Sequence, residues 1–202
     1  MARRRPKDPA ALVLWPGAGT GADHPSLLAI RDAITEMPVE PVDFPYRREG
    51  RKAPDRAPKL IASIVDEVAR IAEGLGVETS RLVIGGRSMG GRMCSMAAAE
   101  GLEVAGVVLI AYPLHPPTKP DKLRTEHLGD LRVPSLWLCG DRDPFGTPEE
   151  IGDAQSLVKG PVTSVTLKGR HDLKGTDAEV IAEIRDWLGL GRRHPPARPR
   201  SR

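Results

Sequence analysis

Residues 86–90 read GRSMG, a G-x-S-x-G pattern that can hold a serine hydroxyl ready for nucleophilic attack. The apolar run from Leu82 to Gly86 predicts a short buried strand before the serine. The stretch from Met89 to Glu100 is rich in Met and Ala and lacks Pro, which predicts a helix after it. A strand, a tight turn and a helix in this order would keep Ser88 exposed on a strained turn. We therefore predict that Ser88 is a nucleophile.

A serine nucleophile needs a base that takes its proton and a group that orients the base. Asp143 follows the apolar run that ends at Cys139, and His171 follows the run that ends at Leu167. The carboxyl ends of parallel strands meet at one edge of a sheet, so both side chains are expected beside Ser88. The sequence thus predicts a triad of Ser88, Asp143 and His171.

Other residues compete for two of these roles. Asp141 could orient the base instead, but Asp143 lies farther past the strand and reaches more easily across to the loop of His171. His115 and His24 are rival bases, since each lies in a loop between predicted elements. His171 is preferred because its loop joins the last predicted strand to the last predicted helix.

The negative charge that develops on an attacked carbonyl oxygen is best stabilised by two backbone N–H donors. One donor is predicted at Met89, directly after the serine. The other is predicted at Ala18, in the glycine-rich loop of residues 16–21 that follows the first strand.

The same loop also fits part of a dinucleotide-binding fingerprint. Gly17, Gly19 and Ala22 follow a strand, and Asp43 lies at the end of the next one. Pro25 argues against this interpretation, because proline favours the first position of a helix and so places the helix start after the glycines. A pyrophosphate would then lack a helix N-terminus at the loop. We predict that no cofactor is required.

Further side chains are expected around the site. Arg87, Arg92 and Arg170 flank it, where they could bind an acidic substrate group or, as we favour, pair with nearby aspartates. The predicted substrate-lining residues are Gly17, Arg87, Tyr112, His115 and Phe145. No metal site is predicted, because the two cysteines lack metal-ligand spacing.

Short apolar runs alternate with helical patterns along the chain. The predicted strands are 11–15, 39–44, 82–86, 104–110, 135–139 and 162–167, and the predicted helices are 24–36, 59–73, 89–100, 148–158 and 176–188. This alternation predicts an α/β fold, with a parallel sheet covered by helices on both faces. The stretches 45–58 and 112–130 are expected to be loops, the longer one beside the site.

Positive charge is concentrated at the two ends of the chain. The net charge of the 202 residues is +3, but residues 1–7 and 191–202 hold nine Lys and Arg residues and no acid, which leaves −6 for residues 8–190. We therefore predict a domain over residues 10–190 between two basic tails, residues 1–9 and 191–202. The seven aromatic residues argue against a base-stacking surface for nucleic acid.

The apolar runs of this sequence are short. None approaches the roughly 20 residues of a membrane span. Pro16 also interrupts the apolar run after the basic N-terminus, unlike a signal peptide. These features predict a cytoplasmic protein without a membrane partner, and a homo-oligomer stays open.

Three segments together resemble one family. Residues 85–90 (GGRSMG), 112–117 (YPLHPP) and 140–144 (GDRDP) are similar to the α/β-hydrolase superfamily, in its small, cap-less, dienelactone-hydrolase-like branch. More narrowly, they resemble the group of the hydrolase-like subunit of the non-specific-lethal chromatin complex and its bacterial relatives. This resemblance implies a single-domain minimal α/β-hydrolase fold, with a mainly parallel six-stranded sheet in the order 2-1-3-4-5-6. It implies the same triad of Ser88, Asp143 and His171.

These features predict a serine hydrolase that cleaves a small carboxylic ester, thioester or lactone through an acyl-enzyme intermediate. The alternative is a hydrolase-like interaction or scaffold protein with little or no turnover, since some relatives in this group have no known substrate. A perhydrolase that uses peroxide on the same residues is a third interpretation. The chain departs from the family in having Pro16 and Gly17 where many members have His and Gly, and in leaving no room for two further strands before Ala11.

Overall fold

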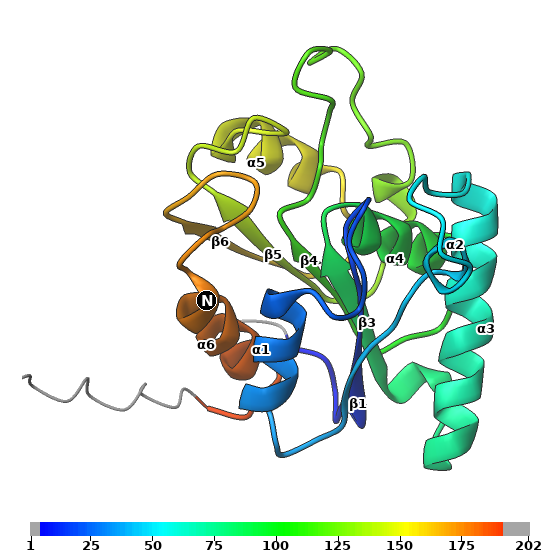
Figure 1. Cartoon of the computed structure of the whole chain (residues 1–202). Coiled ribbons are helices and arrows are strands. Elements are labelled where there is room, and N and C mark those ends of the chain that lie inside the picture. The colour runs from blue at the N-terminus through cyan, green and yellow to red at the C-terminus, as the bar shows by residue number, and fades with distance from the viewer. Residues whose placement is uncertain (1–4, 192–202) are drawn as a thin grey trace, which may run out of the picture.

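A parallel sheet of six strands lies at the centre of the structure (Figure 1). The computed structural model describes residues 5–191. The strands are β1 (Ala11–Trp15), β2 (Val39–Pro41), β3 (Leu82–Arg87), β4 (Gly106–Ile110), β5 (Ser135–Gly140) and β6 (Val162–Leu167). Neighbouring strands pair in parallel in the order β2-β1-β3-β4-β5-β6, which confirms the predicted α/β fold and the order 2-1-3-4-5-6.

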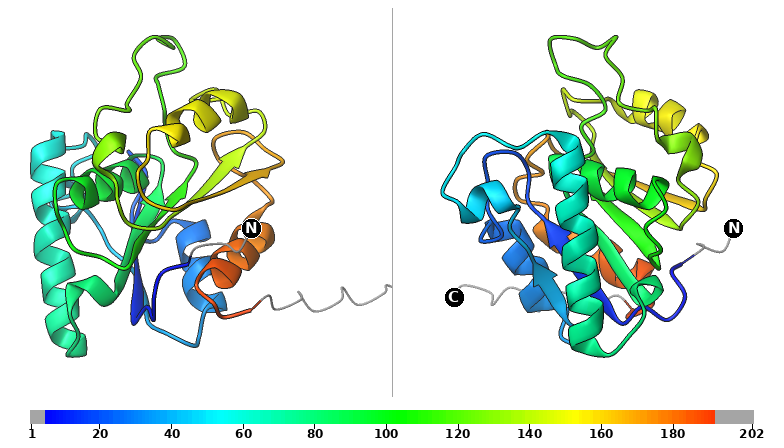
Figure 2. Two further views of the ribbon diagram at one scale, coloured as in Figure 1. Left: turned by 180° about the vertical axis from the view of Figure 1, so that it is seen from behind. Right: turned by 90° about the vertical axis from the view of Figure 1, so that its right-hand side faces the viewer.

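Helices cover both faces of the sheet (Figures 1 and 2). On one face lie α1 (Pro25–Ala33) and α6 (Asp177–Trp187), and on the other lie α3 (Ala57–Leu75), α4 (Met89–Ala99) and α5 (Pro148–Ser156). The short elements are α2 (Pro45–Arg48) and two 3₁₀ turns, η1 (Thr79–Arg81) and η2 (Leu128–Asp130). The helices therefore bury the two apolar faces of the sheet.

The central strands are apolar on both sides because both sides are covered. In β1, Leu12 and Leu14 join the core that includes α1 and α6, whereas Val13 and Trp15 join the core that includes α3 and α4. All four side chains are at most 1% exposed. Successive side chains of a strand point to opposite faces, so a continuous apolar run is what a doubly covered strand requires.

Two predicted elements differ from the observed ones. The predicted strand 39–44 ends at Pro41 on the edge of the sheet, although the N–H of Val42 still donates to the Leu14 carbonyl oxygen on β1 at 2.9 Å. The predicted loop 45–58 begins with α2, where Pro45 occupies the first helical turn and Tyr46 is fully buried. The segment after β2 is thus partly a core element rather than only a surface loop.

The contact between β1 and the turn at Ser88 depends on two glycines. A Cβ atom at Gly86 would overlap the main chain of Trp15, and one at Gly90 would lie 2.6 Å from the carbonyl oxygen of Pro16. Gly86 also has φ 154°, a conformation that side chains rarely allow. The glycines of the G-x-S-x-G pattern therefore let β1, β3 and α4 approach one another closely.

Residues 112–130 extend beyond the sheet edge between β4 and β5, as the green loop of Figure 1 shows. The Tyr112 hydroxyl donates to the Arg124 carbonyl oxygen at 2.6 Å, and the Arg124 guanidinium donates to the Pro113 carbonyl oxygen at 3.0 Å. Nε2 of His127 lies 2.8 Å from Oγ of Ser95 on α4. The first two bonds join the two arms of the long loop, and the third ties the loop to α4.

Residues 5–9, from the predicted N-terminal tail, lie against the domain. Arg5 forms an ion pair with Asp186 on α6 at 3.1 Å, and Asp8 pairs with Arg81 at 2.9 Å. Residues 1–4, and residues 192–202 of the other predicted tail, lie outside the described part of the chain. None of the helices within residues 5–191 combines the length and apolar character that crossing a membrane requires.

Replacing Gly86 with Ala should destabilise the fold by more than about 3 kcal/mol, because the new Cβ meets backbone that cannot move aside and φ is unfavourable. Gly74→Ala is the matched control. This glycine lies in α3 with open space around it, so alanine should stabilise the helix by about 0.5–1 kcal/mol. Chemical denaturation measures both free energies of unfolding, and an unchanged midpoint for Gly86→Ala would contradict the proposed contact.

The stability should also depend on pH through His127. Burial, and then the nearby Arg92 cation, lower the pKa of His127 from 6.5 to about 4. Between these values the unfolded chain binds a proton that the folded protein does not, so the free energy of unfolding should fall as the pH drops from about 6.5 to about 4. His127→Gln can keep a bond to Ser95 and should reduce this slope. Denaturation curves at several pH values measure the difference, and equal slopes would refute it.

Candidate active site

Ser88 lies on the sharp turn between β3 and α4, where its backbone has φ 48° and ψ −116°. A positive φ is strained for a residue with a Cβ atom, so the surroundings must maintain it. The Ser88 N–H donates to the Ile110 carbonyl oxygen on β4 at 2.8 Å, and the Ser88 carbonyl oxygen accepts from the N–H of Arg92 at 3.1 Å. The turn thereby holds the serine partly exposed at the carboxyl edge of the sheet.

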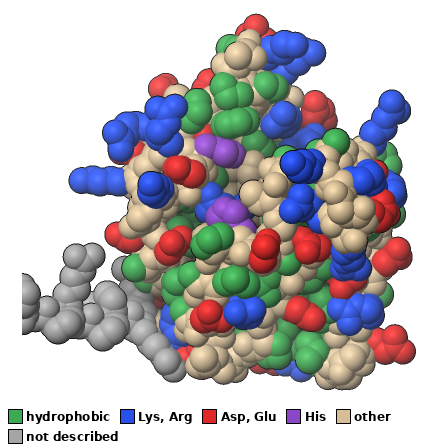
Figure 3. Space-filling view, viewed as in Figure 1, with side chains coloured by type: hydrophobic (Ala, Val, Ile, Leu, Met, Phe, Trp, Pro, Cys, Tyr) green, Lys and Arg blue, Asp and Glu red, His purple; other side chains and the backbone are tan. Residues whose placement is uncertain are grey.

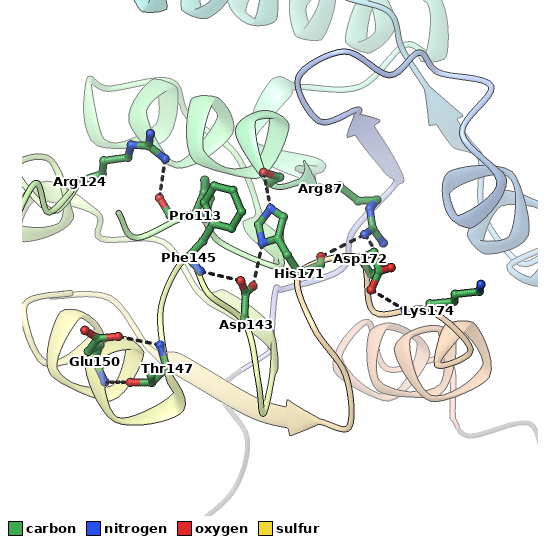
Figure 4. Close-up of polar contacts among 11 residues, drawn as sticks. Arg87, Pro113, Arg124, Asp143, Phe145, Thr147, Glu150, His171, Asp172 and Lys174 are labelled. Atoms are coloured by element: carbon green, nitrogen blue, oxygen red, sulfur yellow. Dashed lines mark hydrogen bonds and ion pairs between the residues drawn. The ribbon is translucent and has the colours of Figure 1, made fainter. Parts of the chain in front are cut away.

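His171 and Asp143 lie beside Ser88 at this edge. Oγ of Ser88 is 2.8 Å from Nε2 of His171, and Nδ1 of His171 is 2.8 Å from Oδ2 of Asp143. Figure 4 shows the imidazole facing the Asp143 side chain. A carboxylate oxygen only accepts hydrogen bonds, so Nδ1 donates and the lone pair of Nε2 is free to accept the serine proton. The three predicted residues are therefore brought together in a geometry suited to general-base chemistry.

Phe145 supports both the carboxylate and the imidazole. Its main-chain N–H donates to Oδ1 of Asp143 at 2.8 Å, so both oxygens of this buried carboxylate have a partner. Its ring stacks on that of His171, with the ring centroids 4.1 Å apart and the planes at 29° (Figure 4). The carboxylate and the imidazole are thus each held on two sides.

Arg87 holds the loop that carries His171. Its guanidinium donates to the carbonyl oxygens of Asp172 at 2.8 Å and His171 at 3.4 Å, and to Oγ of Ser26 on α1 at 3.3 Å. Arg87 is only 8% exposed, and burial lowers its pKa. The pairing with aspartate carboxylates that the sequence favoured is replaced by bonds to main-chain oxygens. Arg87 therefore links β3, α1 and the His171 loop.

A cavity of about 720 Å³ opens in front of Ser88 and His171. Figure 3 shows histidine and Lys or Arg side chains gathered around a hollow on this face. Gly17 forms part of the wall, close enough that a Cβ atom there would lie 3.6 Å from Cβ of Ser88. Ala18 and Met89, the two predicted oxyanion residues, line the same cavity. The loop after β1 therefore faces the serine, as the chemistry requires.

Three of the five predicted lining residues, Gly17, Arg87 and Phe145, line this cavity, and two do not. Tyr112 packs inward against Trp137, with the ring centroids 4.9 Å apart. His115 is 5% exposed, and its ring nitrogens lie 3.1 Å from the Pro116 carbonyl oxygen and 3.4 Å from Oε2 of Glu150. The predictions for Tyr112 and His115 are corrected, because the chain after β4 directs both side chains into the interior below the long loop.

Asp141 and His24, two other candidates for the catalytic roles, make hydrogen bonds to other groups. Asp141 accepts a hydrogen bond from the N–H of Gly169 at 2.8 Å, which lowers its pKa, and lies 3.5 Å from Arg142. His24 lines the cavity, but its Nδ1 lies 2.9 Å from Oγ of Ser26 at the start of α1. Neither side chain makes a hydrogen bond to Ser88 or His171 within residues 5–191.

The cavity also contains residues that the sequence did not indicate. Arg124 lines it from the long loop, together with Pro113, Thr20 and Pro144. Arg124 is far from Ser88 along the chain and belongs to no motif, so only the folded loop brings it to the site. Arg92 and Arg170, predicted to flank the site, line the cavity as well.

The loop after β1 is not arranged as a dinucleotide site. Helix α1 begins at Pro25, after the glycines, and Oδ1 of Asp43 accepts from the N–H of Ala22 at 2.8 Å. The acid of the fingerprint therefore stabilises the loop. Within the described part of the chain, no group of three or more His, Cys, Asp or Glu side chains could hold a metal ion. Cys94 and Cys139 are buried thiols, and burial raises the pKa of Cys139 to about 12.

A family model described as "Alpha/beta hydrolase domain" matches residues 8–183. The chain belongs to the α/β-hydrolase family. Three segments suggested this family, and all of them lie within the matched region: the serine turn, the chain after β4 and the loop after β5. The α/β-hydrolase fold accounts for the strand order and for the position of Ser88 between β3 and α4.

Several solved structures share this fold. Dienelactone hydrolase from Anabaena variabilis superposes with a TM-score of 0.71 at 18% identity, covering 94% of this chain and 90% of that one. Est1E from Butyrivibrio proteoclasticus gives 0.71 at 15% identity, covering 92% and 88%. The type II thioesterase BorB of the borrelidin biosynthetic cluster gives 0.62 at 19% identity, covering 94% and 97%. At these identities the likeness shows the α/β-hydrolase fold alone.

Arg87→Gln should slow the reaction of Ser88 with a fluorophosphonate by about 100-fold, because the His171 loop loses its buried anchor and the imidazole shifts. Arg87→Lys keeps a cation and should recover part of the rate. The labelling rate is measured over a range of probe concentrations, which separates probe binding from the chemical step. The loss should lie in the chemical step. A folded Arg87→Gln variant that reacts at the wild-type rate would refute this positioning role.

Proposed function

We propose that this α/β hydrolase cleaves a small carboxylic ester, thioester or lactone with Ser88 as its nucleophile. The observation that carries the proposal is the continuous line of two 2.8 Å contacts from Ser88 through His171 to Asp143, open to a cavity of about 720 Å³. An exposed serine, a base and a buried carboxylate in this order are what acyl transfer needs.

In the first half-reaction, Oγ of Ser88 attacks the substrate carbonyl carbon while Nε2 of His171 takes the hydroxyl proton. Asp143 keeps the proton on Nδ1 and stabilises the imidazolium that forms. The main-chain N–H groups of Met89 and Ala18 stabilise the carbonyl oxygen as it becomes negative. The tetrahedral intermediate then collapses, His171 gives its proton to the leaving oxygen or sulfur, and Ser88 keeps the acyl group.

In the second half-reaction, a water molecule replaces the leaving group. His171 takes a proton from the water, the resulting oxygen attacks the acyl carbon, and the proton passes to Oγ of Ser88 as the acid leaves. In a lactone the leaving alcohol stays attached to the acyl group, so one product is released. Both half-reactions use the same base, which agrees with the hydrogen bond between His171 and Ser88.

The names of two structural neighbours support this choice of bond. They include a dienelactone hydrolase and a type II thioesterase, whose names refer to a lactone and a thioester. The size of the cavity is within the range of about 300–1,000 Å³ that is usual for small-molecule sites.

Ser88→Ala should abolish labelling by a fluorophosphonate and lower the hydrolysis rate of p-nitrophenyl acetate by about 10⁴-fold or more, because no nucleophile remains. Asp143→Asn should cost about 10⁴-fold, because Nδ1 loses its acceptor and the tautomer changes. Ser156→Ala is the matched control, since Ser156 is exposed on α5 and bonds only its own helix. Intact-mass spectrometry and absorbance at the nitrophenolate band measure the two effects.

Two results would overturn the proposal. Wild-type protein that is not labelled at Ser88 and turns over neither p-nitrophenyl acetate nor S-acetyl-N-acetylcysteamine would leave the fold without this chemistry. Labelling that persists in Ser88→Ala would place the nucleophile elsewhere. A stoichiometric protein partner together with the first result would favour the scaffold alternative.

A further inference from the structure

Arginine dominates the charge of the cavity. Four arginines line it, while Asp172 is the one acid among the lining residues that the structure describes. This is the reverse of the domain as a whole, since residues 8–190 carry a formal charge of −6. The guanidinium of Arg87 is already used by the His171 loop. The lining arginines are Arg87, Arg92, Arg124 and Arg170.

Arg92 and Arg124 are close enough to repel each other. Arg92 comes from α4 and Arg124 from the long loop, and both are partly buried. Burial lowers the pKa of Arg124, and the Arg92 cation lowers it further. Glu126 is the carboxylate that acts on Arg124, raising its pKa, yet neither arginine has a carboxylate oxygen within the 4.0 Å of an ion pair among residues 5–191.

The two guanidinium groups also keep unused donors. Nε of Arg92 is buried and has no hydrogen-bond partner in the described structure. Burial raises the pKa of the Tyr112 hydroxyl, and the Arg92 cation lowers it. This hydroxyl donates a hydrogen bond to the Arg124 carbonyl oxygen. The Arg124 guanidinium makes one hydrogen bond within residues 5–191, from one terminal nitrogen to the Pro113 carbonyl oxygen. A guanidinium has five N–H donors, so donors other than the buried Nε of Arg92 remain for an anion in the cavity.

Arginines elsewhere in the described chain are mostly paired. Arg51 contacts Asp55 at 2.9 Å, Arg70 contacts Glu67 at 2.6 Å, and Arg185 contacts Glu36 at 2.7 Å. Arg92 and Arg124 therefore differ from most arginines of the described chain. Two like charges that are partly removed from water are costly to hold together, and an anion between them would offset that cost.

We propose that Arg92 and Arg124 form an anion subsite, and that the substrate carries a carboxylate or phosphate group beside the bond that Ser88 cleaves. This inference rests on the proposed hydrolase function and narrows its substrate class. The anion is either on the acyl chain, as in a dicarboxylic half-ester, or on the leaving group, as in a coenzyme A thioester. A planar guanidinium fork binds both kinds of oxyanion with two parallel hydrogen bonds.

Matched substrates test the preference and locate the anion. On the acyl side, mono-p-nitrophenyl adipate is compared with its neutral amide counterpart, p-nitrophenyl 6-amino-6-oxohexanoate. On the leaving-group side, acetyl coenzyme A is compared with S-acetyl-N-acetylcysteamine. In at least one pair the anionic substrate should have a kcat/KM higher by about tenfold or more, as expected for charged hydrogen bonds.

Arg92→Gln and Arg124→Gln should bring that ratio close to one, chiefly by raising KM for the anionic substrate of the pair. Arg92→Lys should retain part of the preference because it keeps a charge. Arg31→Gln is the matched control, since Arg31 is an exposed arginine paired with Asp32 on α1, away from the cavity lining. Its ratio should equal that of the wild type.

Ratios of one or below in both pairs, with neutral esters hydrolysed normally, would overturn the subsite and leave the hydrolase function standing. A preference that survives in both glutamine variants would overturn it as well.

Calorimetric binding of adipate and of free coenzyme A to the wild type and the two variants separates the subsite from the function. If no ester is hydrolysed but one of these probes binds and is lost in both variants, the subsite holds and the hydrolase function fails. Binding of neither probe to the wild type would overturn the subsite.

Discussion

The main-chain carbonyls of Trp15 and Pro16 lie against Gly86 and Gly90, at points where any side chain would collide. This contact lets β1, β3 and α4 meet, and everything at the site follows from it. It places the loop after β1 beside the serine and packs the turn of Ser88 on both sides. The strained φ of Ser88 costs on the order of 1–3 kcal/mol. That strain can persist because the hydrogen bonds around the turn and the buried strand before it hold the backbone in this conformation.

Parallel strand pairing brings the remaining groups to the same place. Ser88, Asp143 and His171 follow β3, β5 and β6, which all end at one edge of the sheet. The chain after β4 runs outward instead of closing over this edge, and the hollow remains open (Figures 1 and 3). Topology alone places these residues within several ångströms. The contacts of Arg87 and Phe145 bring the imidazole to hydrogen-bonding distance of both partners.

The arginines near the site have different roles, which depend on their burial and on their hydrogen-bond partners. Arg87 is nearly inaccessible to solvent and donates hydrogen bonds to main-chain oxygens, so its role is to hold the His171 loop in place. Arg92 and Arg124 have no carboxylate partner within the described residues and line the cavity. The sequence suggested aspartate partners for the arginines near the site. Aspartates do lie nearby, but Asp141 and Asp143 are engaged by the Gly169 amide and by His171. Among the described lining residues, Asp172 alone opposes four arginines, so the cavity is cationic.

The sequence by itself determined the elements and their order. Apolar runs and helical spacing are local properties, so β1, β6 and the serine turn could be placed from residue types alone, and the pattern at Ser88 pointed to the nucleophile. Only the tertiary structure decided which loop side chains enter the cavity. Tyr112 and His115 turn into the interior, whereas Arg124, outside every motif, lines the cavity. The direction of a loop side chain depends on the packing of distant segments against one another, and that information is absent from any short stretch of sequence.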